Sequence, residues 1–144
     1  MSERNYTRRI FKYKLDVERR QVVMMPKGAE VLRLGVQRGL PHIWVSVDES
    51  QPLEPYAFRG VTTGERYNEE RLWYIGTVEL DDWFVWHLFI IEQALPANPN
   101  DEEEVRWQAD FDQIKRDIKA REDLSEEDTY ESGELVPPHR KVPV

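Results

Sequence analysis

Residues 83–91, with the sequence Trp-Phe-Val-Trp-His-Leu-Phe-Ile-Ile, constrain the fold of this chain more than any other segment. Eight of these nine residues are apolar, and three of the eight are β-branched. A short run that is apolar on both faces is typical of a strand covered from two sides. A chain of 144 residues has the size of one ordinary domain, so it must find both covers in itself or in a partner.

Earlier segments also predict strands. Residues 10–17 alternate, with Phe11, Tyr13, Leu15 and Val17 on one face. Turn-forming sequences separate the other predicted strands, which are residues 21–25, 31–37, 42–47, 56–62 and 72–80. Residues 48–55 are expected to form a loop, and the polar residues 65–71 a helical turn. Short strands at regular spacing, with no helical pattern between them, predict an antiparallel sheet curled into a barrel or sandwich.

The pattern changes after Pro96 and Pro99. Asn100 or Asp101 can cap a helix, and three acidic residues follow where the helix dipole favours them. An apolar stripe then recurs at spacings of four, three and four residues: Trp107, Phe111, Ile114 and Ile118. Two roles are open for this stripe. It can pack on the exposed face of the sheet and give the last strand its second cover, or it can reach another subunit or a partner protein.

The expected fold is therefore mainly β with one C-terminal α-helix, an α+β arrangement with about six to seven short strands in an antiparallel barrel or sandwich. Residues 1–95 are expected to form the β domain, and residues 96–124 an acidic amphipathic helix packing on it. Residues 125–144 have few apolar side chains and three prolines, which predicts an extended or flexible tail.

Charge is distributed unevenly along the chain, whose formal net charge is −8. Residues 1–20 hold seven basic and three acidic residues, whereas residues 101–134 hold fourteen acidic and five basic ones. This asymmetry predicts either steering toward a partner or docking of one end of the chain on the other. The chain has no cysteine, no secretory signal and no apolar run approaching the ~20 residues of a membrane span, so we expect a soluble cytoplasmic protein without membrane contact.

Several catalytic and cofactor-binding motifs are absent from the sequence. It contains no Walker A loop, Gly-x-Gly-x-x-Gly, Gly-x-Ser-x-Gly, His-Glu-x-x-His or EF-hand loop. Its histidines lie at no diagnostic spacing for a metal, so we expect no cofactor, no metal and no enzymatic activity. His87 is interpreted as a core or interface residue. A catalytic His87 would need a carboxylate neighbour, for which Glu79 and Glu92 are the cross-strand candidates.

Tryptophan and acidic side chains supply the candidate interface. Strand aromatics beside a basic N-terminal segment could stack nucleic-acid bases, but the chain is acidic, so direct nucleic-acid binding is not expected. The helix acids could imitate duplex phosphates, although interspersed basic residues weaken that interpretation. Because tryptophan anchors protein interfaces, we predict protein–protein binding. The candidates are Trp73, Trp83, Trp86, Trp107, Glu102, Glu103, Asp110 and Asp117.

Several segments together resemble a family of short, mostly phage-encoded proteins described only as a domain of unknown function. They follow one another in the same order and spacing over about residues 8–91: Ile10-Phe11-Lys12-Tyr13, Met25-Pro26-Lys27-Gly28-Ala29-Glu30-Val31-Leu32, Ile43-Trp44-Val45-Ser46-Val47-Asp48, Phe58-Arg59-Gly60-Val61-Thr62-Thr63-Gly64, Tyr74-Ile75-Gly76-Thr77 and the closing aromatic strand to Phe89. Relatives of this kind end soon after the last strand, so residues 97–144 are an extension that the resemblance does not explain.

The resemblance implies a small β-rich phage accessory protein in the host cytoplasm, with no catalytic residues to carry over. Such a protein would bind a host or phage protein, for example to inhibit a host factor or host defence. Two alternatives remain open beside it. The chain could be a structural or self-assembling phage subunit, or it could be a small-molecule binder or hydrolase that uses His87.

Overall fold

The computed structural model describes residues 7–81 and 84–128, with side chains given as far as Arg121. Seven strands and one long helix follow one another along the chain. They are β1 (Arg9–Lys14), β2 (Arg20–Pro26), β3 (Glu30–Gln37), β4 (Leu40–Val47), β5 (Leu53–Thr62), β6 (Leu72–Asp81), β7 (Phe84–Ile91) and α1 (Glu102–Asp128).

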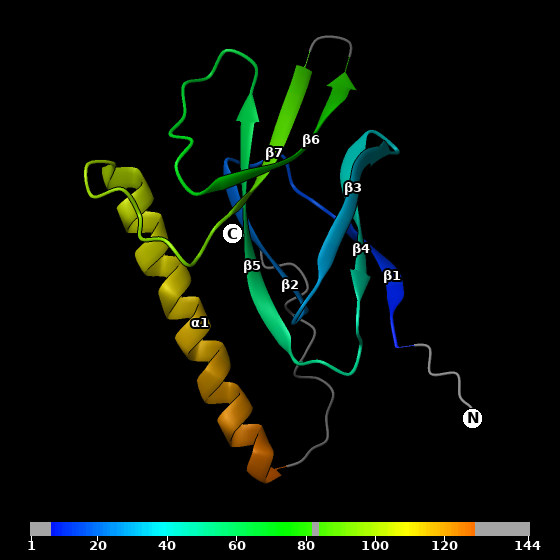
Figure 1. Cartoon of the computed structure of the whole chain (residues 1–144), viewed down its shortest axis with the longest axis vertical. Helices are drawn as coiled ribbons and strands as arrows, with labels where there is room; N and C mark the ends of the chain where they lie inside the picture. Colours follow the sequence, from blue (N-terminus) through cyan, green and yellow to red (C-terminus); the bar gives the residue numbers. More distant parts are fainter. Residues whose placement is uncertain (1–6, 82–83, 129–144) are drawn as a thin grey trace.

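The strands form two antiparallel sheets that pack face to face as a sandwich (Figure 1). One sheet has the order β1-β4-β3 and the other β2-β5-β7-β6. The predicted mainly β fold with a C-terminal helix is confirmed. Of the two predicted arrangements, the strands form the sandwich, because they belong to two separate sheets. The inward side chains of both sheets make one core, whose largest fully buried members are Trp86, Phe58, Leu15, Met25 and Ile43. This core fixes the position of every strand that borders the site described below.

Most strand boundaries follow the predicted ones, but β5 begins at Leu53, inside the predicted loop. Pro55 lacks a backbone N–H and is normally excluded from the middle of a sheet. Here it pairs with Met24 of β2, while the ladder between β5 and β7 starts only at Phe58. Pro55 therefore lies where β5 has a strand on one side only, and its missing donor disrupts no hydrogen bond between strands.

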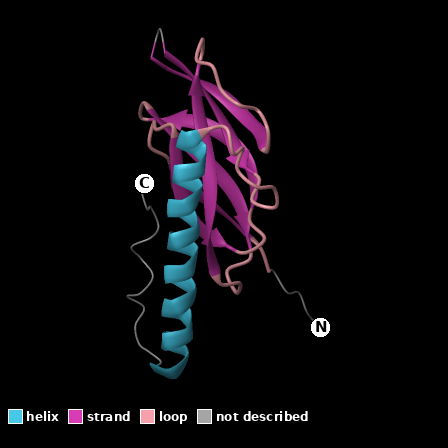
Figure 2. Ribbon diagram, turned by 90° about the vertical axis from the view of Figure 1, so that its left-hand side faces the viewer, coloured by secondary structure: helices cyan, strands magenta, loops and turns pink. Residues whose placement is uncertain are grey.

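α1 lies on the outer face of the four-stranded sheet, so the molecule has three layers (Figures 1 and 2). Asp101 caps the helix, because its Oδ1 accepts a hydrogen bond from the backbone N–H of Glu104 at 3.1 Å. Phe111 is 1% exposed and packs in a small second core with Val22, Ala57 and Ile91. Within the described residues, no helix combines the length and apolarity that crossing a bilayer requires.

The outer face of β7 is covered partly by α1 and partly by tyrosine side chains. α1 covers it at Ile91. Phe89 instead contacts two tyrosine rings, Tyr67 at 5.4 Å and Tyr74 at 5.6 Å between ring centroids. The segment 65–71 that carries Tyr67 has no helical turn, so that prediction is wrong. Its residues form an irregular loop because side chains such as Glu65 bond the end of β5 instead of the segment's own backbone.

Candidate functional site

A groove of about 450 Å³ lies between α1 and the start of β2. The apolar side chains in it are Val22, Trp107, Phe111 and Ile114, and charged side chains share the lining: Glu18, Arg19, Arg20, Glu103, Arg106 and Asp110. The Trp107 and Phe111 rings stack at 5.2 Å with an interplanar angle of 11°. Because these two residues are one helical turn apart, the regular geometry of α1 places both rings on the side facing the sheet.

A smaller cavity of about 150 Å³ adjoins the groove where the start of α1 meets the loop 65–71. Five arginines line it: Arg19, Arg20, Arg59, Arg66 and Arg71. The acids in the lining are Glu65, Asp101, Glu103 and Glu104, of which three come from the start of α1. The groove and the cavity share Arg19, Arg20, Glu103 and Trp107, so these side chains form the boundary between them.

Glu103 bridges the two arginines at the start of β2. Arg19 Nη1 donates to both carboxylate oxygens at 3.0 and 2.8 Å, and Arg20 Nη1 lies 3.1 Å from Oε2. The hydrogen bond from Arg19 is the main reason that the pKa of Glu103 is lowered, and the same bond raises the pKa of Arg19. The basic N-terminal region and the acidic C-terminal region therefore meet in this structure, at one carboxylate.

Arg71 holds α1 to the strands by a second, buried contact. Its side chain is 2% exposed, and Nε donates to Glu104 Oε2 at 2.8 Å. The remaining nitrogens donate to the backbone oxygens of Glu92 and Leu95 and to Gln108 Oε1. Two of these four acceptors lie in the segment that follows β7 and two lie on α1, so one guanidinium joins the two parts of the chain. Its backbone has φ +59°, a conformation that costs a non-glycine residue energy and that these bonds stabilise.

Arg59 is the second buried arginine of this region. It is 7% exposed, and its Nη1 donates to Gly60 O at 2.6 Å. Both Nη atoms are 3.4 Å from Glu65 Oε2, which is long for a charged pair. Burial lowers the pKa of Arg59, and the neighbouring charge of Arg20 lowers it further.

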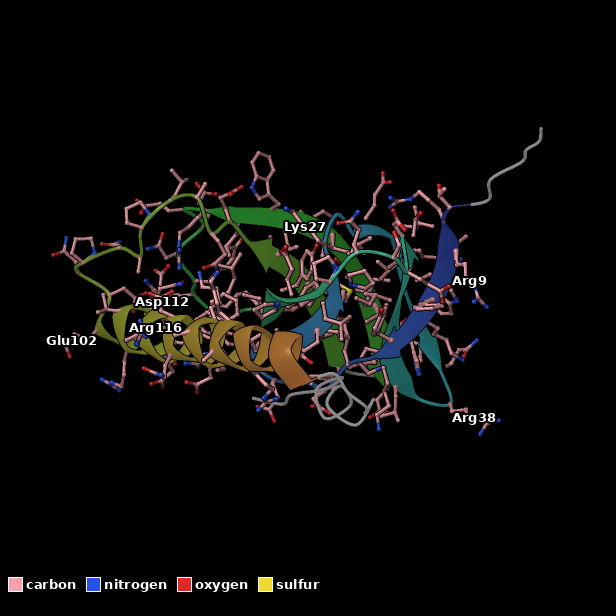
Figure 3. All side chains as sticks on the ribbon, turned by 90° about the horizontal axis from the view of Figure 1, so that it is seen from below. Arg9, Lys27, Arg38, Glu102, Asp112 and Arg116 are labelled. Atoms are coloured by element: carbon pink, nitrogen blue, oxygen red, sulfur yellow. The ribbon has the colours of Figure 1, made fainter. Side chains whose placement is uncertain are left out.

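Three of the predicted interface residues, Glu103, Trp107 and Asp110, lie together in the groove. Glu102 and Asp117 are exposed on α1 but line neither cavity. Figure 3 shows Glu102 directed away from the body of the molecule. Trp73 is 61% exposed on β6, lines neither the groove nor the cavity, and donates from Nε1 to Glu92 Oε1 at 3.0 Å.

The other two tryptophan candidates have different outcomes. Trp86 is 1% exposed and belongs to the central core, so its prediction as an interface residue is wrong. The alternation of β7 turns this ring inward, where it packs against Gly60. Trp83 lies outside the described residues.

Among the described residues, His87 has no carboxylate as a hydrogen-bond partner. Its Nε2 contacts Thr63 Oγ1 at 2.8 Å, and its Nδ1 contacts Thr77 Oγ1 at 2.9 Å. Glu92 is instead bonded to Trp73 and to the backbone of Ala94. His87 lines neither the groove nor the cavity. In the described part of the chain, no three His, Cys, Asp or Glu side chains are grouped so that they could hold a metal.

The arginines of the cavity were not among the predicted site residues. Arg59 and Arg71 are far apart in sequence and belong to no motif, so only the sheet pairing and the loop path bring them together. One signal was present: Arg59 interrupts the apolar end of a strand, and a buried arginine in a strand requires a partner.

A family model described as a domain of unknown function, DUF7352, matches residues 6–98. This range takes in all seven strands and ends before α1 begins. No curated protein and no solved structure matches the chain.

Proposed function

The chain belongs to the DUF7352 family of domains of unknown function, and we propose that it is a small non-enzymatic accessory protein of phage type that binds one protein partner through the groove between α1 and β2. The partner would be a host or phage protein in the cytoplasm of the infected cell, and inhibition of a host factor is the simplest consequence of such binding. The phage setting rests on the sequence resemblance described above.

The observation that carries this proposal is the composition of the groove. Apolar side chains, among them Trp107 and Phe111, are surrounded by charged ones of both signs. An apolar centre with a polar rim is the usual anatomy of a protein interface, and tryptophan is enriched among the residues that dominate binding energy. A partner could insert an apolar side chain beside Trp107 and pair its own charges with Arg106 and Asp110.

The proposal is tested by recovering partners of the full chain from phage-infected cells with the wild type and two variants. Asp110→Arg reverses a charge in the groove, whereas Asp117→Arg makes the same change on α1 outside the groove. We expect one stoichiometric partner with the wild type and with Asp117→Arg, and its loss with Asp110→Arg. Recovery of no stoichiometric partner, or of the same partner with all three proteins, would contradict the proposal.

Self-association is a second candidate, favoured by the exposure of Trp73 and Tyr74. Both are 61% exposed on β6, which is an edge strand of its sheet. An exposed edge carrying aromatic side chains is a surface that a second copy can pair with. Light scattering of the wild type and of Trp73→Ser separates the two candidates. A wild-type dimer that Trp73→Ser converts to a monomer supports self-association, and a wild-type monomer excludes it.

A further inference from the structure

We propose that the arginine-lined cavity at the start of α1 binds a phosphate group, and that Glu103 occupies its arginines as an internal competitor when no ligand is bound. This site and ligand go beyond the partner-binding function proposed above and do not depend on it. The cavity and the groove share the Arg19–Glu103–Arg20 bridge, and most of the other groove residues do not line the cavity.

The first observation is a pair of like charges in the sheet. Arg20 of β2 and Arg59 of β5 are direct cross-strand partners. Their side chains are only 10% and 9% exposed. Like charges directly opposite each other destabilise a sheet, and burial increases the cost. A local arrangement that opposes folding in this way is typical of a binding site.

The second observation is that the carboxylates of this chain neutralise the pair incompletely. Arg59 reaches Glu65 only at 3.4 Å, whereas charge-assisted hydrogen bonds usually measure about 2.7–2.9 Å. Arg20 is paired with Glu103, a carboxylate that Arg19 also uses. Two largely buried guanidinium groups therefore face one cavity with hydrogen-bonding capacity to spare, and an oxyanion that entered would be held by both.

The third observation concerns which acidic side chain could leave the cavity when a phosphate group binds. Asp101 caps α1, and Glu104 is committed to the buried Arg71. Glu103 differs from both, because its side chain is 53% exposed and can turn outward without breaking the helix. Its two oxygens already accept from arginine as phosphate oxygens would. Leaving the site would cost Glu103 little, so it acts as a removable stand-in for the ligand.

The size and the electrostatic field of the cavity favour phosphate as its ligand. A volume of about 150 Å³ admits a small oxyanion rather than a large ligand. Arginine forks match phosphate oxygens in bidentate geometry. The cavity also lies at the N-terminal end of α1, where the helix dipole favours negative charge. The phosphate can belong to a small molecule or to a nucleic-acid backbone, since the recognition chemistry is shared.

The test is a calorimetric titration of the full chain at constant ionic strength with three probes: inorganic phosphate, a nucleoside monophosphate and a single-stranded oligonucleotide. Glu103→Gln removes the competitor, and Arg66→Gln removes an exposed lining arginine that has no hydrogen-bond partner among the described residues. We expect Glu103→Gln to bind roughly fivefold to tenfold more tightly than the wild type, and Arg66→Gln to bind several-fold more weakly.

Two matched controls separate the cavity from general electrostatics. Glu102→Gln makes the same charge change one residue earlier, outside the cavity. Arg38→Gln removes an arginine from the β3–β4 turn, which Figure 3 shows at the end of the molecule away from α1. Both are expected to bind like the wild type.

The outcomes assign or exclude the site. Tighter binding of inorganic phosphate or the monophosphate by Glu103→Gln assigns it to small phosphate ligands, and a response confined to the oligonucleotide assigns it to a nucleic-acid backbone. Binding of none of the three probes, or equal gains from Glu103→Gln and Glu102→Gln, overturns the proposal. Neither result bears on partner recovery with Asp110→Arg, so the two proposals fail separately.

Discussion

Gly60 leaves room on β5 for the indole of Trp86, the largest fully buried side chain. A Cβ at this position would lie 2.5 Å from Trp86 Cζ2 and 2.5 Å from the backbone oxygen of Glu18. Neither neighbour can yield, because the indole is 1% exposed and the oxygen belongs to the main chain. The absence of a side chain at residue 60 therefore determines where the centre of the core lies.

Gly60→Ala is expected to lower the free energy of unfolding by about 2–3 kcal/mol, as overpacking in a filled core does. Urea denaturation measures this change. Gly35→Ala is the control, since its Cβ would meet the edge of the half-buried Trp44 ring at 3.1 Å and the Arg33 side chain at 3.5 Å, and it should cost under about 1 kcal/mol. Equal losses for the two variants would show that Gly60 has no special role.

Arg71 and Glu104 form the most buried ion pair of the described residues, with side chains 2% and 12% exposed. Glu104→Ala leaves the guanidinium charge buried without its carboxylate, so we expect a loss of about 3–5 kcal/mol in the free energy of unfolding. Glu49→Ala removes the exposed partner of Arg9, and it should cost under about 1 kcal/mol. A small effect of Glu104→Ala would mean that the backbone oxygens around Arg71 suffice.

At the scale of elements, α1 is held by very few side chains. Phe111 is 1% exposed in the second core, whereas Ile118, two turns further on, is half-buried and outside that core. Phe111→Ala is expected to cost about 3–4 kcal/mol. In this variant, hydrogen exchange should become faster in α1 than in the strands. Ile118→Ala, the control on the same helix, should cost under about 1 kcal/mol, and an equal cost would place the anchor further along α1.

The contact between β2 and α1 also predicts a dependence on pH. The pKa of Glu103 is lowered from its ordinary value of 4.5, chiefly by the hydrogen bond from Arg19. Its stabilisation is therefore fully present above pH 4.5 and is lost as the pH falls through the lowered folded value. Glu103→Gln should show a shallower loss of stability between about pH 5 and pH 3. The difference should stay under about 1 kcal/mol because the carboxylate is 53% exposed.

The strands were predictable from the sequence because alternation and turn residues are local signals. Arg38 and Gly39, for example, have φ values of +55° and +77°, as a tight hairpin turn requires. The pairing of β2 with β5 was not predictable, since it joins residues more than twenty positions apart that share no local signal. For the same reason Trp107 and Asp110 could be selected from the helix pattern, while the cavity that brings Arg59 together with the other arginines could not be predicted.

At the scale of the whole molecule, the contacts described above predict that α1 and the sandwich unfold together. Phe111 needs Val22 and Ile91 in place, and Arg71 needs both the end of β7 and α1. The unfolding transitions followed by circular dichroism at 222 nm and by tryptophan fluorescence should therefore have the same midpoint in urea. Loss of the helical signal at a lower concentration would show that α1 is an independent unit.

The four bonds of Arg71 have a mechanical consequence. The chain leaves β7, passes the two backbone oxygens that Arg71 holds at Glu92 and Leu95, and enters α1, whose Glu104 and Gln108 accept from the same guanidinium. A tension applied to the C-terminal end of α1 is thus carried by side-chain contacts around Arg71 and Phe111 before it reaches β7. A pulling force applied through a tether at this end should detach α1 from the sandwich while the strands are still paired.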